Sequence, residues 1–138
     1  MARYFNSKTT GTEARFLSLQ NILLLSFGAA FGAVTRHWLG VIVLKHNRHN
    51  FPLGTLLINT SGAALLGIFC GFGVTGSPYV LLGDGFCGAF TTFSTFAVEG
   101  VQLIQGKAKR KALLFVVASI VFGVVGFLSG YFLNRIFA

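Results

Sequence analysis

Long apolar runs separated by short polar stretches dominate the pattern along this chain. The four runs cover residues 19–44, 51–74, 79–104 and 112–137. A helix needs about 20 predominantly apolar residues to cross the roughly 30 Å hydrocarbon core of a bilayer, and each run is long enough. The pattern predicts an all-α integral membrane protein with four transmembrane helices. They form a single domain over residues 19–138, which follows a polar N-terminal tail over residues 1–18.

The composition supports a membrane protein and removes several other classes. Hydrophobic residues make up 54% of the chain, charged residues only 10%, and the mean hydropathy is +0.74. A soluble domain carries about 25% charged residues, so an ordinary soluble domain is excluded. Cys70 and Cys87 lie inside apolar runs and have no CxxC or Cys/His spacing. This spacing argues against a disulfide framework and a zinc site.

The net charge of +8 points to membrane lipid and not to nucleic acid as a partner, because the basic residues lie between apolar runs. With four spans, one side of the membrane receives four basic residues, namely Arg3, Lys8, Arg15 and Arg135. The other side receives six, namely Lys45, Arg48, Lys107, Lys109, Arg110 and Lys111. This bias is weak, and two interpretations stay open. Either the chain inserts in both orientations, or the cluster in the third loop fixes that loop in the cytoplasm.

The third run has an unusual distribution of small and hydroxyl residues. Three glycines precede four hydroxyl residues within five positions. Since glycine and hydroxyl side chains weaken a helix, we expect a break near Gly88–Thr92. Broken helices at membrane depth are buried in protein or line a wet cavity, where they can bind ions. Thr91, Ser94 and Thr95 are expected to share one helical face. The alternative is that these hydroxyls only bond to their own helix.

Further polar residues lie inside the other runs, and together with the third run they predict a polar track. They are Thr55, Asn59, Thr60 and Ser119. No carboxylate or histidine lies in the middle of a run. Asp84 and Glu99 lie near run ends, and so does the basic residue Arg36. Hydroxyl and amide donors suit a small anion, and the positive ring edges of Phe93 and Phe96 could add anion contacts. The sequence contains no nucleophile with a base, phosphate loop or metal cluster, so we do not expect an enzyme.

Pairs of glycines four residues apart recur along the runs, at Gly28/Gly32, Gly67/Gly71 and Gly126/Gly130. Such pairs allow helix backbones to approach closely in lipid. They are expected to serve packing either within the chain or against a second copy.

Three motifs together resemble one known family. They are GAVTR at residues 32–36, FPLGTLLIN at residues 51–59 and GFCGAFTTFSTF at residues 85–96, followed by Glu99. These motifs, in this order across all four runs, resemble the Fluc-type (CrcB) bacterial fluoride ion channel family. The resemblance implies an antiparallel, dual-topology homodimer with two fluoride pores at its interface. It also implies passive export of cytoplasmic fluoride across the bacterial cell (inner) membrane.

The resemblance further implies roles for individual residues. The fluoride pore would be lined by Phe93, Phe96, Asn59, Thr55, Ser94, Thr95 and Ser119. Arg36 would lie in an aqueous vestibule and Glu99 near a pore end. The backbone carbonyls of Gly88 and Thr91 would hold a structural sodium ion, and no organic cofactor is implied.

The sequence departs from the family pattern at three positions. Ala89 replaces a usual second glycine, Asp84 replaces an uncharged residue, and Gly123 stands where some members have a hydroxyl. Two other functions remain as alternatives. A proton-coupled small multidrug-type exporter would need a carboxylate in the first run, which has none. A membrane subunit that transports nothing is the second alternative.

Overall fold

The fold consists of helices joined by short connections. The computed structural model describes residues 18–46 and 51–137, and this part of the chain contains no strand. In chain order the elements are α2 (Leu19–His46), α3 (Leu53–Gly71), α4 (Ser77–Tyr79), the π-helix η1 (Val80–Cys87), α5 (Gly88–Phe90), α6 (Phe93–Gln105) and α7 (Lys109–Phe137). The predicted tail, except for Ser18, and Arg48 of the first loop lie outside the described residues, so the division into tail and domain stays a prediction.

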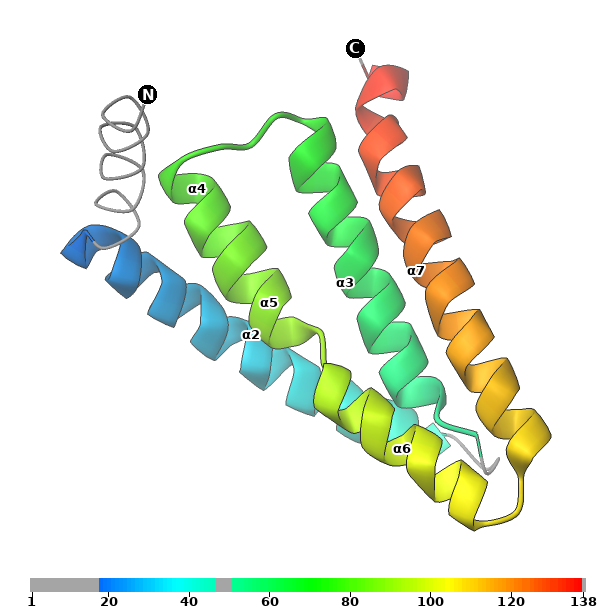
Figure 1. The fold of residues 1–138 in the computed structure, drawn as a ribbon. Coiled ribbons are helices and arrows are strands. Elements are labelled where there is room, and N and C mark those ends of the chain that lie inside the picture. The colour runs from blue at the N-terminus through cyan, green and yellow to red at the C-terminus, as the bar shows by residue number, and fades with distance from the viewer. Residues whose placement is uncertain (1–17, 47–50, 138) are drawn as a thin grey trace, which may run out of the picture.

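Successive segments run in alternating directions. In Figure 1, α2 descends, α3 rises, the run from α4 to α6 descends, and α7 rises beside α3. Among the described residues, three helices are long and apolar enough to cross a membrane, namely Leu19–Lys45, Leu53–Gly71 and Lys109–Ile136. The chain is therefore a multi-pass membrane protein, and the part of it that the structure describes is all-helical. The third predicted run does not form one such helix, because it is divided among four shorter elements.

The fourth predicted run begins earlier than expected. Helix α7 starts at Lys109, so three of the four basic residues that we assigned to the third loop, Lys109, Arg110 and Lys111, form its first turn. Lysine and arginine are good helix formers, and charged side chains can extend a helix beyond the apolar core. The connection from α6 is correspondingly short, and Lys107 turns the chain there with a φ of 58°.

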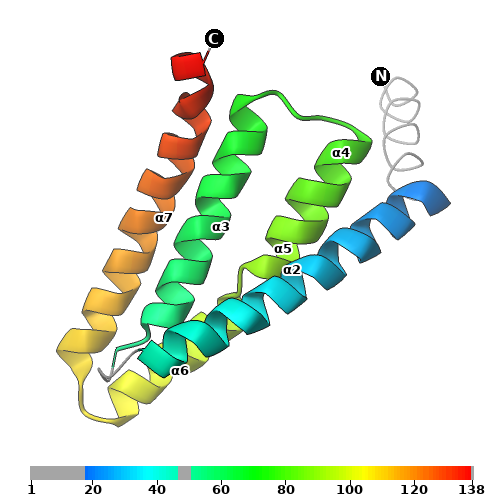
Figure 2. The ribbon, with the colours of Figure 1, turned by 180° about the vertical axis from the view of Figure 1, so that it is seen from behind.

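Two glycines of α2 bring this helix into backbone contact with η1. A Cβ atom on Gly28 would overlap the carbonyl oxygen of Leu81, and one on Gly32 would overlap that of Phe86. The π-helix itself was not predicted, because a one-residue widening of a helix leaves no periodic signal in a short, glycine-rich stretch. Figure 2 shows α2 lying across this segment on the face opposite to the view of Figure 1.

Helices α3 and α7 also pack through glycines. A Cβ atom on Gly67 would overlap the carbonyl oxygen of Phe127, one on Gly71 that of Tyr131, and one on Gly130 that of Ala64. The Asn134 amide donates a hydrogen bond to the Gly71 carbonyl at the end of this contact. Of the two expectations for the glycine pairs, packing within the chain is therefore the one that the structure shows.

The buried core is small, and most large apolar side chains lie on the outside. Phe115 is the one large side chain among the described residues that is fully buried, and its ring packs against Phe51 and Phe96 at centroid distances of 5.9 and 5.1 Å. By contrast, large residues of α2 and α7 such as Phe31 and Val121 are exposed. Such surfaces suit contact with lipid or with another membrane protein chain.

The close contact of α3 with α7 predicts a position-dependent effect of alanine. Gly67→Ala should lower the free energy of unfolding by about 1–3 kcal/mol, because the added methyl overlaps backbone atoms that cannot move independently. Gly123→Ala is the matched control on α7, since a Cβ atom there meets nothing within 4 Å. Unfolding in mixed detergent micelles checks this, and equal stability of the two variants would contradict the packing.

Candidate functional site

The third segment is broken at two residues between α5 and α6. Thr91 and Thr92 have extended backbones, with φ/ψ of −74°/159° and −144°/117°, whereas Gly88 is helical. The predicted break near Gly88–Thr92 is confirmed. The predicted shared face of Thr91, Ser94 and Thr95 is wrong, because Thr91 precedes α6 and its hydroxyl donates back to the Cys87 carbonyl at 3.0 Å.

One side chain of α3 satisfies the backbone at this break. The Asn59 Nδ2 group donates to the Thr92 carbonyl at 3.0 Å, and the Thr92 N–H donates to Asn59 Oδ1 at 2.8 Å. Unpaired backbone groups are very unfavourable in a bilayer core. The Asn59 amide thus replaces the partner that a continuous helix would provide to the Thr92 N–H, and it adds a second donor to the Thr92 carbonyl.

The side chain of Thr92 begins the next helix. Its Oγ1 accepts a hydrogen bond from the Thr95 N–H at 3.2 Å, which is an N-cap of α6. The same hydroxyl donates to Thr95 Oγ1 at 3.0 Å and lies 3.3 Å from Ser94 Oγ. We did not single out Thr92 from the sequence. The signal was present, since a threonine directly before an apolar helix is a typical N-cap.

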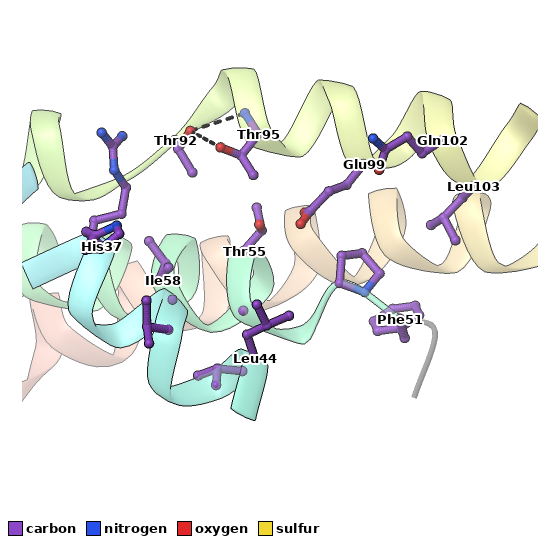
Figure 3. Close-up of a pocket in the computed structure, with 16 residues that line it drawn as sticks. His37, Leu44, Phe51, Thr55, Ile58, Thr92, Thr95, Glu99, Gln102 and Leu103 are labelled. Carbon is purple, nitrogen blue, oxygen red and sulfur yellow. Dashed lines mark hydrogen bonds between the residues drawn. The ribbon is translucent and has the colours of Figure 1, made fainter. Parts of the chain in front are cut away.

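A cavity of about 700 Å³ lies between α2, α3 and α6 (Figure 3). Its polar lining consists of Arg36, His37, Thr55, Thr92, Thr95, Glu99 and Gln102. The structure therefore brings together four predicted residues, Arg36, Thr55, Thr95 and Glu99. It adds His37, Thr92 and Gln102. Whether these residues face the cavity depends on how the three helices pack, which the sequence does not show. The rest of the wall is largely apolar and comes from residues such as Val41, Leu44 and Phe51.

The cavity carries one fixed positive and one negative side chain. Arg36 Nη1 donates to the Thr91 carbonyl at 3.3 Å and so connects α2 to the break. Glu99 points from α6 into the cavity, toward the side occupied by Thr55 (Figure 3). Its Oε2 atom is buried and has no hydrogen-bond partner among the described residues. The two charges thus act on the cavity separately and do not neutralise each other as a pair.

Five of the predicted pore residues do not line this cavity, and one of them, Asn59, lies at the break, where it bonds to Thr92. Phe93 is 80% exposed, and Phe96 packs between Phe93 and Phe115. Ser94 is exposed beside Thr92, and the Ser119 hydroxyl donates to the Phe115 carbonyl of its own helix at 2.7 Å. Within one chain the polar track therefore reaches from the cavity to the break and does not extend to α7.

The break also affects the two carbonyls that the resemblance assigns to sodium. The Thr92 N–H, which would otherwise close a helical turn onto the Gly88 carbonyl, donates to Asn59 instead. This bond leaves the Gly88 carbonyl without the Thr92 N–H, and Gly88 is an exposed residue. The Thr91 carbonyl keeps a second lone pair beside its bond from Arg36. Hard oxygen donors of this kind fit a sodium ion.

The three departures from the family pattern have different surroundings. Asp84 is exposed on η1, Ala89 is half-buried in α5, and Gly123 faces open space on α7. No contact among the described residues gives these three positions a role at the cavity.

Comparisons with known proteins identify relatives across most of the chain. Residues 23–131 match the protein family described as "CrcB-like protein, Camphor Resistance (CrcB)". A protein of Clostridium acetobutylicum named "Fluoride-specific ion channel FluC 2" is 42% identical over 113 residues, which are 82% of this chain and 97% of that protein. Proteins of the same name from Bacillus cereus and Haloarcula marismortui are 48% and 40% identical, over 75% and 80% of this chain and 87% and 90% of theirs.

The double hydrogen bond of Asn59 predicts a large effect of its removal. Asn59→Leu should lower the free energy of unfolding by about 1–3 kcal/mol, because the Thr92 N–H loses its partner in a bilayer core. Ser61→Ala is the control on the same helix, since the Ser61 hydroxyl bonds only to carbonyls one turn back in α3. Thermal unfolding in detergent measures both. Equal melting temperatures would show that the Asn59 bonds do not hold the break.

Proposed function

Since the chain belongs to the CrcB-like family, we propose that it is a passive, fluoride-selective ion channel that exports cytoplasmic fluoride. The observation that carries this proposal is the cavity that leads from Arg36 to the break held by Asn59. The names of the relatives supply the ion and agree with a channel, not an enzyme. The bacterial cell (inner) membrane is the proposed location.

The polar lining gives a physical route for a small anion. Arg36 stays charged at all relevant pH values and raises the local concentration of anions in the cavity. The hydroxyls of Thr55 and Thr95 then offer donors that replace water around fluoride. Asn59 uses one amide hydrogen on Thr92 and keeps the second for an ion. Glu99 repels anions near the pore end, which keeps binding weak enough for the ion to leave.

A second copy of the chain would complete the pore. Phe93 is an exposed aromatic residue beside the break, so a path along its ring edge needs another wall. We place Phe93, Phe96, Ser94 and Ser119 in two pores at the interface of an antiparallel, dual-topology homodimer. The third segment would be the fourth membrane crossing, and the weak bias of basic residues supports insertion in both orientations. A mass of one chain in detergent micelles would contradict the dimer.

A structural sodium ion is proposed at the centre of that dimer. The Gly88 carbonyl, which lacks the Thr92 N–H as a partner, and the Thr91 carbonyl would hold it, and its charge would favour anions in a bilayer core. Replacing sodium by a bulky organic cation should lower the melting temperature of the dimer. An unchanged melting temperature would remove the ion from the proposal.

Purified protein in liposomes provides the direct test of function. We expect fluoride release at least about 100 times faster than chloride release, because the donors in the cavity favour the smaller, more basic anion. An ion-selective electrode measures both. Equal rates would contradict selectivity, fluoride release that requires a proton gradient would indicate an exporter, and no release would indicate a subunit without transport.

Substitution of the aromatic residues tests the pore walls. Phe93→Ile and Phe96→Ile should reduce fluoride release at least about 10-fold, because an aliphatic side chain lacks the positive ring edge. Leu57→Ile serves as a control at an exposed apolar position on α3. The oligomeric mass should be unchanged in all three variants. Full fluoride release by both phenylalanine variants would exclude these rings from the pore.

A further inference from the structure

His37 lies on the cavity wall beside the permanent cation Arg36. His37, Gly40, Val41 and Leu44 all line the cavity, and their spacing of three, four and seven residues places them on one stripe of α2. This shared stripe explains how an exposed side chain contributes to the cavity wall, as Figure 3 shows. The sequence alone gave His37 no role, because the residue lies near the end of an apolar run.

The charged groups that face this cavity are few. Helix α2 provides Arg36 and His37, and α6 provides Glu99. The lining residues from α3 and from the segment before it are uncharged. Arginine does not titrate in this range, so His37 and Glu99 are the groups among the described lining residues that can change their charge. A protonated His37 would give the cavity two positive side chains against one negative side chain.

We infer that His37 is a second anion-attracting group of this cavity, and that its protonation raises the rate of fluoride passage in acid. The inference rests on the proposed function. An imidazolium ring donates N–H hydrogen bonds, and it is a weaker acid than HF, so the proton stays on nitrogen and fluoride crosses as the anion. Histidine is the side chain whose charge ordinarily changes between about pH 5 and pH 8.

This arrangement would match the conditions in which fluoride enters cells. Acid converts fluoride into HF, which crosses lipid bilayers and releases fluoride again in a neutral interior. In the cavity that faces the acidic side, His37 would then be protonated and would add one positive charge. A dual-topology dimer places one such cavity on each side of the membrane, so one of its two cavities would face the acidic side in either orientation of the dimer.

The test compares fluoride release at two pH values, with the same pH inside and outside the liposomes. The wild-type rate should be at least about threefold higher at about pH 5.5 than at about pH 8, after subtraction of HF leakage from protein-free liposomes. In His37→Gln the ratio of the two rates should fall to about one. In His37→Lys the ratio should also be about one, with the rate at the higher pH close to the wild-type rate in acid.

Matched controls separate this inference from the proposed function. His46→Gln and His49→Gln remove the other two imidazoles of the chain, and both should keep the wild-type ratio. A wild-type ratio of one would overturn the inference while leaving the channel intact. A raised ratio that persists in His37→Gln would overturn it too and assign the pH effect to Glu99. Absence of fluoride release at both pH values would instead contradict the proposed function.

A second measurement does not depend on transport. In protein labelled with ¹⁵N-histidine, fluoride should shift the ring signal that His37→Gln removes, and this shift should be larger at about pH 5.5 than at about pH 8. If His37→Gln fails to insert into the membrane, His37→Asn and His37→Lys can replace it, both to assign the ring signal and to compare the fluoride release rates at the two pH values. A His37 ring signal whose chemical shift does not change with fluoride at either pH value would overturn the inference.

Discussion

Backbone groups that leave a helix inside a bilayer must find partners within the protein, and the break between α5 and α6 depends on this requirement. The Asn59 side chain meets it at Thr92 with one donated and one accepted hydrogen bond. The Thr92 side chain then caps α6. Two residues therefore hold the irregular segment in place, and the same bonds take the Thr92 N–H away from the Gly88 carbonyl.

The break can be held in place because the helices around it pack with little freedom. Gly28 and Gly32 hold α2 against η1, and Gly67 and Gly71 hold α3 against α7. The hydrophobic effect does not stabilise these contacts within lipid, so close backbone approach and van der Waals packing must stabilise them. Helix α3 thereby fixes Asn59 at the depth of the break, and α2 fixes Arg36 beside the Thr91 carbonyl.

The same arrangement determines the electrostatics of the cavity. Arg36 from α2 and Glu99 from α6 line one cavity without forming an ion pair among the described residues, so the electric fields of both side chains act on an ion in that cavity. The hydroxyl groups between them provide neutral donors. A channel needs attraction strong enough for entry and weak enough for exit, and opposite charges at separate positions along one path suit this balance. In the proposal for His37, protonation of its ring adds a second positive charge to this cavity.

The sequence by itself determined the membrane class, the helical runs and the location of the break, because hydropathy and glycine/hydroxyl density act locally along the chain. It also singled out Asn59, Arg36 and Glu99 as polar residues in apolar surroundings. Only the tertiary structure decided their partners, the role of Thr92, the widening of η1 and the presence of His37 on the cavity wall. These features depend on how helices rotate and cross, which residues distant in the sequence decide together.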